Sequence, residues 1–255
     1  MTLSVITICF NAEKEIERTM SSVLNQSYND MEYIVVDGKS TDRTMEIVDR
    51  IASNYPKRKI TIISEPDGGI YDAMNKGVKK ASGVWISMMN AGDSYVSNDV
   101  LSEIFSNPIP ENINFLYSDF YKSTSFGKYF RVSTKCTDTV RSLVHQSVIY
   151  KKCLHQEHGY YAVTKQIIIS DYLFFLRIPI DQIEKVDTVI ARYEGNGVSE
   201  QGSWCRKQAI CAEVVFRQES FWNVYWVFLR WKLKRILPLR IREIIRLIMS
   251  GVEIV

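Results

Sequence analysis

The sequence predicts an α/β protein with a mostly parallel central sheet flanked by helices. Four short, strongly apolar segments occur in the first hundred residues, and amphipathic helical patterns separate them. Short strands that alternate with helices indicate a parallel sheet covered on both faces. Nearly continuous apolar character is typical of strands buried in such a sheet.

The predicted elements of this first part follow in order. The apolar segments predict strands over residues 3–10, 32–37, 59–64 and 83–89. Helical spacing of apolar residues predicts a helix after the first strand and another after the second. The first of these helices has its apolar stripe at Ile16, Met20, Val23 and Leu24, and the second has it at Met45, Val48 and Ala52.

The pattern changes from about residue 110. Strand-like segments follow one another at residues 113–121, 127–132 and 145–151, and a helix is expected over residues 167–178. A further strand is expected over residues 184–193. This half is therefore mixed rather than strictly alternating.

Residues 204–255 predict a basic amphipathic helical tail. It carries ten Lys and Arg against four Asp and Glu, although the whole chain has a net charge of only +3. One apolar stripe consists of Trp222, Trp226, Leu229, Leu233 and Ile236, and a second of Leu237, Ile241, Ile244, Ile245 and Ile248. Such a helix suits an anionic membrane surface. It equally suits packing on the rest of the chain or on a second subunit.

The composition of the chain excludes several classes of protein. The five cysteines among 255 residues show no Cys-x-x-Cys spacing, so we expect a reduced, cytoplasmic protein without a zinc site. No signal peptide is recognisable, and no uncharged apolar run approaches 18 residues. No nucleic-acid motif accompanies the basic tail, so no nucleic-acid partner is expected.

Polar residues follow all four predicted strands of the first part, at 7–11, 37–40, 65–69 and 90–93. Parallel sheets bind ligands at this edge. Neither G-x-G-x-x-G nor the P-loop pattern is present, so a bound diphosphate would need a metal ion to neutralise it. Asp93 is the candidate ligand for that ion.

Four ordered segments then carry a family resemblance: "VITICFNAEKEIERTMSSVLNQSY", "YIVVDGKSTDRT", "SEPDGGIYDAMNKGVKKASG" and "MNAGD". Together they resemble a family 2 glycosyltransferase of the GT-A fold. The resemblance implies a catalytic domain over residues 1–203, with a nucleotide-binding half at 1–97 and an acceptor-side half at 98–203. It also implies a nucleotide-diphosphate sugar donor (a UDP-sugar as first choice), Mn²⁺ or Mg²⁺, and inversion at the anomeric carbon.

The resemblance assigns most of the candidate residues to the donor. Asp37 matches the acid that pairs with the base ring, but it could instead cap the next helix. Asp72 could instead be a first-turn acid that faces the helix dipole. The full donor-side set is Thr7, Phe10 and Asn11 for the base, Asp37 for its ring, Asp72 and Asn75 for the ribose and donor, and Asn90, His145 and Gln146 for the sugar or acceptor.

The resemblance gives two further acids chemical roles. Asp93 matches the last acid of the family's metal motif, and Gly92 stands where an adjacent acid is common. Asp171 matches the catalytic base, and its apolar neighbours are expected to raise its pKa. The alternatives are a plain turn at Asp93 and a helix N-cap at Asp171. His145 could be a core histidine, and we expect no role for His155 and His158, which we place in a loop.

The resulting prediction is a non-processive glycosyltransferase. The Q-x-x-R-W stretch of processive synthases is absent. The tail favours a lipid-linked saccharide acceptor in bacterial surface-polysaccharide assembly, at the inner face of the cell membrane. The alternatives are a catalytically silent carbohydrate-binding or scaffold protein and a sugar-nucleotide pyrophosphorylase, which would want a Gly-rich phosphate loop after the first strand.

Overall fold

The computed structural model describes residues 2–124, 127–137, 141–194, 204–217, 220–234 and 236. Seven strands form its central sheet in the order β10-β6-β9-β4-β1-β2-β3. Strand β9 runs antiparallel to β4 and β6, and the other neighbours are parallel, which confirms the predicted sheet. The strands are β1 (Leu3–Cys9), β2 (Met31–Asp37), β3 (Lys59–Ser64), β4 (Trp85–Met88), β6 (Phe115–Tyr117), β9 (Val148–Lys151) and β10 (Ile183–Lys185).

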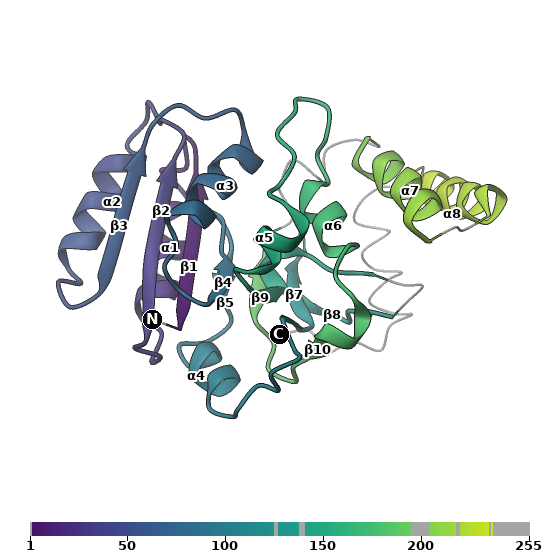
Figure 1. Ribbon diagram of the computed structural model, residues 1–255. Helices are drawn as coiled ribbons and strands as arrows, with labels where there is room; N and C mark the ends of the chain where they lie inside the picture. The colour runs from purple at the N-terminus through teal and green to yellow at the C-terminus, as the bar shows by residue number, and fades with distance from the viewer. Residues whose placement is uncertain are drawn as a thin grey trace.

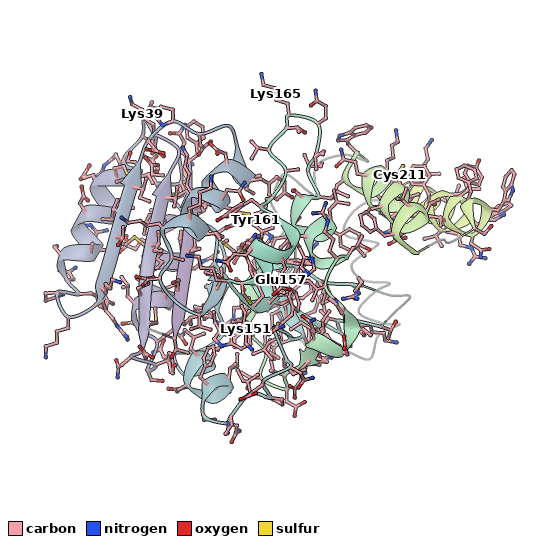
Figure 2. The ribbon with its side chains drawn as sticks, viewed as in Figure 1. Lys39, Lys151, Glu157, Tyr161, Lys165 and Cys211 are labelled. Carbon is pink, nitrogen blue, oxygen red and sulfur yellow. The ribbon has the colours of Figure 1, made fainter. Side chains whose placement is uncertain are left out.

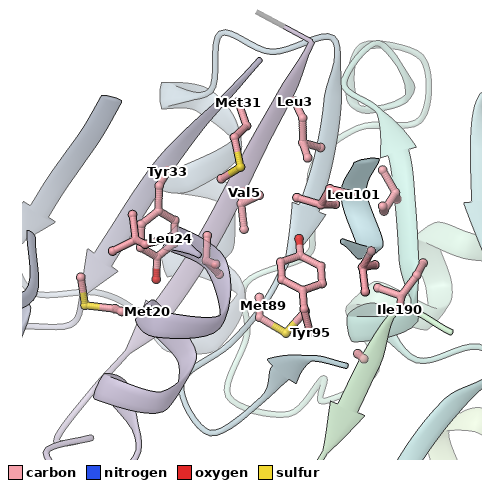
Figure 3. Packing of buried hydrophobic residues seen from close by; sticks show 14 of the residues in the cluster. Leu3, Val5, Met20, Leu24, Met31, Tyr33, Met89, Tyr95, Leu101 and Ile190 are labelled. Carbon is pink, nitrogen blue, oxygen red and sulfur yellow. The ribbon is translucent and has the colours of Figure 1, made fainter. Parts of the chain in front are cut away.

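Helices cover both faces of this sheet (Figure 1). Because side chains alternate along a strand, Leu3 and Val5 of β1 belong to one core cluster, and Ile6 and Ile8 belong to the other. The first cluster lies under α1 (Ile16–Leu24), α2 (Thr44–Ser53) and α4 (Val100–Phe105), and Figure 3 shows its packing. The second lies under α3 (Ile70–Lys80), α5 (Leu154–His158) and α6 (Ser170–Phe175).

Helix α3 approaches the sheet closely at Gly77. A Cβ on this glycine would come within 2.4 Å of Cγ2 of Ile6, which is fully buried in β1. Glycine therefore costs this helix some propensity but allows the backbones to pack together. The contact sets how closely α3 lies on β1.

A second, four-stranded sheet was not predicted. It contains β5 (Ser94–Tyr95), β11 (Ala191–Tyr193), β7 (Phe120–Ser123) and β8 (Tyr129–Val132), in that order. The predicted single strands 113–121 and 184–193 were wrong, because each breaks and passes from one sheet to the other. At the break, the buried Asp119 accepts hydrogen bonds from Arg131 and Thr134 and pairs with Lys185.

The predicted helix 167–178 is shorter than expected. Residues 166 and 167 instead donate their backbone N–H groups to Oγ1 of Thr164, which holds them in a turn before α6. Pro179 ends the segment, and η2 (Ile180–Gln182) follows. Helix α6 is left as a short element whose second residue is Asp171.

The tail begins with two helices, α7 (Trp204–Arg217) and α8 (Phe221–Lys234), which lie together at one side of the molecule (Figure 1). The predicted first stripe does not pack on the sheet, since Trp222, Trp226 and Leu233 are more than half exposed. The second stripe lies outside the described residues. Within the described ranges, no helix is long and apolar enough to cross a membrane.

Candidate active site

The ends of β1, β2 and β4 meet at one edge of the sheet. Gly38, directly after β2, donates its N–H to the carbonyl of Cys9 at the end of β1 across 2.9 Å. Ala91, after β4, donates to the carbonyl of Ile8 across 3.1 Å. The polar residues that follow these strands therefore lie on neighbouring loops, as the parallel order requires.

The loop after β4 is joined to the short helix η1 (His145–Ser147) by two side-chain contacts. Because β4 and β9 are antiparallel, the end of β4 lies beside η1, which precedes β9. Nδ2 of Asn90 lies 2.7 Å from Nε2 of His145, and Nε2 of Gln146 donates to Oδ2 of Asp93 across 2.8 Å. Four predicted site residues thus form two adjacent pairs.

Asp171 joins the same network from α6. Its Oδ2 lies 3.1 Å from Nδ1 of His145, and its Oδ1 accepts a hydrogen bond of 2.8 Å from the hydroxyl of Tyr71. With Asn90 donating to Nε2, a neutral His145 carries its proton on Nδ1 and donates it to Asp171. The network therefore runs from the β4 loop through one imidazole to the carboxylate.

The pKa of Asp171 is lowered, contrary to the expectation from its apolar neighbours. Burial alone would raise this pKa, but the hydrogen bonds from His145, Tyr71 and the backbone N–H of Tyr172 outweigh it. Asp171 is therefore ionised at neutral pH. It can accept a proton, and its usefulness as a base rests on its position.

The pKa of Asp93, in contrast, is raised. The side chain is buried, and loss of hydration raises the pKa to about 6, although His145, Gln146 and the backbone N–H of Glu194 favour the charged form. The surrounding groups therefore offset only part of the free-energy cost of burying the charged carboxylate. An uncompensated buried carboxylate at a strand end is the kind of group that binds a cation.

Helix α1 fixes the turn before Asp93. The hydroxyl of Thr19 donates to the carbonyl of Asp93 across 2.7 Å and accepts from the N–H of Gly92, and the Arg18 guanidinium donates to the carbonyl of Gly92. Gly92 has a φ of +103°, and a Cβ there would face the side chain of Glu15. Glycine stands at this position because the turn requires a left-handed backbone.

The sequence of residues 4–152 matches the family model described as glycosyl transferase family 2. The chain is a family 2 glycosyltransferase. It is also 31% identical over 180 residues to the PGL/p-HBAD biosynthesis glycosyltransferase of Mycobacterium tuberculosis, an alignment that covers 68% of each chain. The resemblance stated from the motifs is thereby confirmed.

Solved structures share the fold of this glycosyltransferase. TarS of S. aureus in complex with UDP-GlcNAc has a TM-score of 0.66 at 18% identity, over 88% of this chain and 69% of that one. The mannosyltransferase PcManGT from Pyrobaculum calidifontis, in complex with GDP-Man and Mn²⁺, has a TM-score of 0.63 at 17% identity, over 82% and 61%. The predicted GT-A fold is confirmed.

Three residues predicted for the base lie where β1 and β2 of the glycosyltransferase end. Phe10 is 63% exposed and its ring lies beside Gly38. Asn11, with a φ of +49°, accepts a hydrogen bond from the N–H of Thr41 and so ties the two loops together. Asp37 is fully buried, and its carboxylate accepts hydrogen bonds from Ser40 and Ser64. In this conformation the hydrogen bonds of Asp37 hold the loop after β2 in place.

Three other candidates make contacts within the protein in this structure. Thr7 does not reach the site, because its side chain is buried under α1 between Tyr33 and the carbonyl of Met89. Asn75 is buried and exchanges two hydrogen bonds with the backbone of Tyr161, so it joins α3 to the segment before α6. Asp72 accepts from the N–H of Gly68 and lies 3.5 Å from Nζ of Lys76, which supports its alternative as a first-turn acid.

Sequence reasoning missed several residues of the site. Tyr71 stands next to the Asp72 that was chosen, yet it is the side chain that reaches Asp171. His155 is not a loop residue without a role: it is buried in α5 and stacks on Phe174 of α6. Its Nε2 lies 3.0 Å from the hydroxyl of Tyr150. The aromatic residues that follow Asp171, at positions 172, 174 and 175, were the available signal for this supporting cluster.

The site suits a divalent cation only with help from a ligand. Over the ranges that the structure describes, no three His, Cys, Asp or Glu side chains are grouped as a metal site. Asp93 supplies one carboxylate, and the buried Oδ1 of Asn90 has no hydrogen-bond partner. Mg²⁺ is commonly held by one or two carboxylates together with substrate phosphates and water. The residues therefore fit an ion that binds together with a diphosphate.

Proposed function

We propose that this enzyme transfers one sugar from a nucleotide-diphosphate sugar, a UDP-sugar as first choice, to a hydroxyl group with inversion at the anomeric carbon. The observation that carries this is the placement of Asp171, which is held by Tyr71 and His145 and linked through His145 to the loop of Asp93. A base and a cation ligand thus meet at the edge where α/β sheets bind ligands. The nucleotide sugars bound to TarS and PcManGT support the choice of donor.

Asp171 acts as the general base in this proposal. One carboxylate oxygen takes the proton of the acceptor hydroxyl while the acceptor oxygen attacks the anomeric carbon. The bond from that carbon to the donor phosphate breaks, and the nucleoside diphosphate leaves from the opposite face. Tyr71, His145 and the backbone N–H of Tyr172 occupy three of the four lone pairs of the carboxylate, which leaves one for the acceptor.

The donor lies along the loops after β1, β2 and β4. The exposed ring of Phe10 offers a surface on which the base stacks. The unpartnered Oδ1 of Asn90 accepts a hydrogen bond from a donor hydroxyl. Asp93 and the donor's diphosphate oxygens would hold Mn²⁺ or Mg²⁺, which would neutralise charge on the leaving group.

We further propose that the acceptor is a lipid-linked saccharide of bacterial surface-polysaccharide assembly, met at the inner face of the cell membrane. The support is the exposed apolar stripe of α8 and the basic character of residues 204–255, beside a catalytic domain at 1–203 with halves at 1–97 and 98–203. Liposome flotation tests this. The full chain is expected to float with anionic vesicles, and a chain without residues 204–255 to stay in solution; flotation independent of the tail would count against the proposal.

The central test is turnover of the donor. The protein is incubated with a panel of UDP- and GDP-sugars, with Mn²⁺ or with a chelator, and the released nucleoside diphosphate is measured. Slow hydrolysis of one donor is expected with Mn²⁺ alone. If no donor is hydrolysed and none raises the melting temperature, the protein is the silent carbohydrate-binding alternative.

A further inference from the structure

An apolar pocket lies between α7 and the segment that enters α6. Its volume is about 330 Å³, which is within the range of small-molecule sites. The labelled Cys211 marks its α7 side in Figure 2. Its lining is almost wholly apolar and comprises Ile167, Ile169, Leu173, Trp204, Lys207, Gln208, Cys211, Ala212, Val215 and Phe216.

Polar contacts at the edge of the pocket hold its two walls together. Oε1 of Gln208 on α7 accepts from the N–H of Ile168 across 2.9 Å, and Nε1 of Trp204 donates to the carbonyl of Gln166 across 2.8 Å. Farther along α7, Glu213 accepts from the hydroxyl of Tyr172 across 3.3 Å. These hydrogen bonds join α7 to the segment before α6, and the pocket between them opens to solvent, since the lining residues Trp204 and Val215 are more than half exposed.

The pocket and the proposed base lie on opposite sides of the same short helix. Ile169 and Leu173 line the pocket and are four residues apart, so they share one face. Asp171 stands between them and contacts Tyr71 and His145 on the other face. The two faces are about one helix diameter apart, roughly 10 to 12 Å, and the path around the helix is half its circumference, roughly 16 to 19 Å. A long substrate could place one end in the pocket and the other at Asp171.

Charge around the pocket favours an anionic ligand. Lys207 lines the otherwise apolar space, and in the described part of the chain it forms no ion pair with a carboxylate. The neighbouring α8 contains Arg230, Lys232 and Lys234 and no acid. A hydrocarbon chain that ends in a phosphate combines the two features that this lining complements.

We propose that the pocket binds the hydrocarbon chain of a lipid-phosphate acceptor, with Lys207 contacting its phosphate. This rests on the proposed function, since it names where that acceptor's lipid is held. The chain enters between α6 and α7, and the attached saccharide passes around α6 to Asp171. Specificity for a lipid-linked acceptor then resides in this glycosyltransferase itself and not only in its meeting a membrane.

Two other occupants of the pocket can be distinguished from a lipid phosphate by experiment. Residues 237–255 carry the second apolar stripe and could cover the pocket, and a second copy of the chain could do the same. Neither would be selective for a lipid phosphate. The experiment therefore compares probes as well as variants.

Farnesyl diphosphate serves as the probe for the full-length protein, with farnesol and inorganic pyrophosphate as comparisons in calorimetric titrations. It is expected to bind at least about tenfold more tightly than either fragment. Ala212→Phe, which fills the pocket, is expected to weaken the binding of farnesyl diphosphate about tenfold. Val227→Phe, on the exposed face of α8, should change this affinity less than about twofold. Lys207→Gln, an exposed change that tests the phosphate contact without filling the core, is expected to weaken it more than Arg230→Gln.

The proposal is overturned if farnesyl diphosphate binds no better than pyrophosphate, or if Val227→Phe weakens it as much as Ala212→Phe. It is also overturned if a chain ending at residue 236 binds the probe more than about tenfold tighter than the full chain, because residues 237–255 then occupy the pocket. A change in molar mass by light scattering with Ala212→Phe would instead assign the pocket to a second copy. Donor hydrolysis is followed in parallel, so loss of the proposed function itself is seen separately.

Discussion

The hydroxyl of Tyr71 donates a hydrogen bond to Oδ1 of Asp171 across 2.8 Å. Tyr71 lies in the first turn of α3, in the half proposed to bind the donor, and Asp171 lies in the first turn of α6, in the half proposed to bind the acceptor. One bond thus connects the two halves of the site. It also helps to keep the pKa of Asp171 low.

Tyr71→Phe removes this bond while it keeps the ring beside Tyr161. The pKa of Asp171 is expected to rise, so the acidic limb of the pH profile of kcat/KM moves to higher pH, and kcat falls about tenfold because the carboxylate is less well oriented. The KM for the donor should change little. Tyr160→Phe, an exposed neighbour, is the control. An unmoved acidic limb would show that Tyr71 does not act through Asp171.

Asp171→Asn removes the proposed base and preserves the shape of the side chain. Transfer is expected to fall by about 100-fold to 10,000-fold, the usual contribution of a general base. Nucleotide binding, measured by calorimetry, should remain. The exposed Asp181→Asn is the matched control. Transfer at a near-normal rate in Asp171→Asn would refute the assignment of the base.

Asp93→Ala removes the carboxylate proposed to hold the cation. The nucleoside diphosphate is then expected to bind equally weakly with and without Mn²⁺, whereas the unaltered protein should bind it more tightly with the ion. Asp99→Ala, an exposed acid at the start of α4, should leave the Mn²⁺ effect intact. If Asp93→Ala retained the full Mn²⁺ effect, the ion would have to bind elsewhere.

His155 predicts a loss of stability in acid. Its burial lowers its pKa from 6.5 to about 4, so the folded state holds the neutral ring while the unfolded chain takes up a proton. The free energy of unfolding should therefore fall by about 3 kcal/mol as the pH drops from 6.5 to 4. His155→Phe keeps the stacking on Phe174 and should flatten this slope in urea titrations. Equal slopes for both proteins would contradict the burial of a neutral ring.

Gly77→Ala tests the close packing of α3 on β1. Alanine would favour the helix by about 1 kcal/mol, but its Cβ would meet Ile6 at 2.4 Å. We expect a net destabilisation of about 1 to 3 kcal/mol by chemical unfolding. In an Ile6→Ala background the same change should cost much less. A stabilising effect in the unaltered background would mean that α3 does not pack this closely.

The strand ends were predictable because a parallel sheet brings its carboxyl ends to one edge whatever the details of packing. Asn90 and Asp93 follow β4 at this edge for that reason, whereas His145, Gln146 and Asp171 were chosen from the family resemblance and are joined to them by contacts. The roles of Thr7 and Asn75 were not predictable in this way, because a polar residue near a strand end or on a helix can point into the protein. Only packing decided that both side chains serve the interior.

The corner at Asp119 shows a different limit. A strand that changes sheets has the same alternation before and after its bend, so the aromatic and apolar residues on both sides of Ser118 and Asp119 suggested one strand over 113–121. The bend depends on partners from β8 and β10, which are distant in sequence. The pKa of Asp171 was misjudged for the same reason, since its neighbours in sequence are apolar but its partners in space are polar.

The turn at Gly92 bears on any attempt to alter donor choice by protein engineering. A designer who compared motifs would introduce an acid at position 92 to restore a doublet with Asp93. The backbone there has a φ of +103°, and the new side chain would point toward Glu15, a residue of the same charge. Redesign of this loop has to begin with Thr19 and Arg18, because their hydrogen bonds set its backbone conformation. That conformation decides which residue types position 92 accepts.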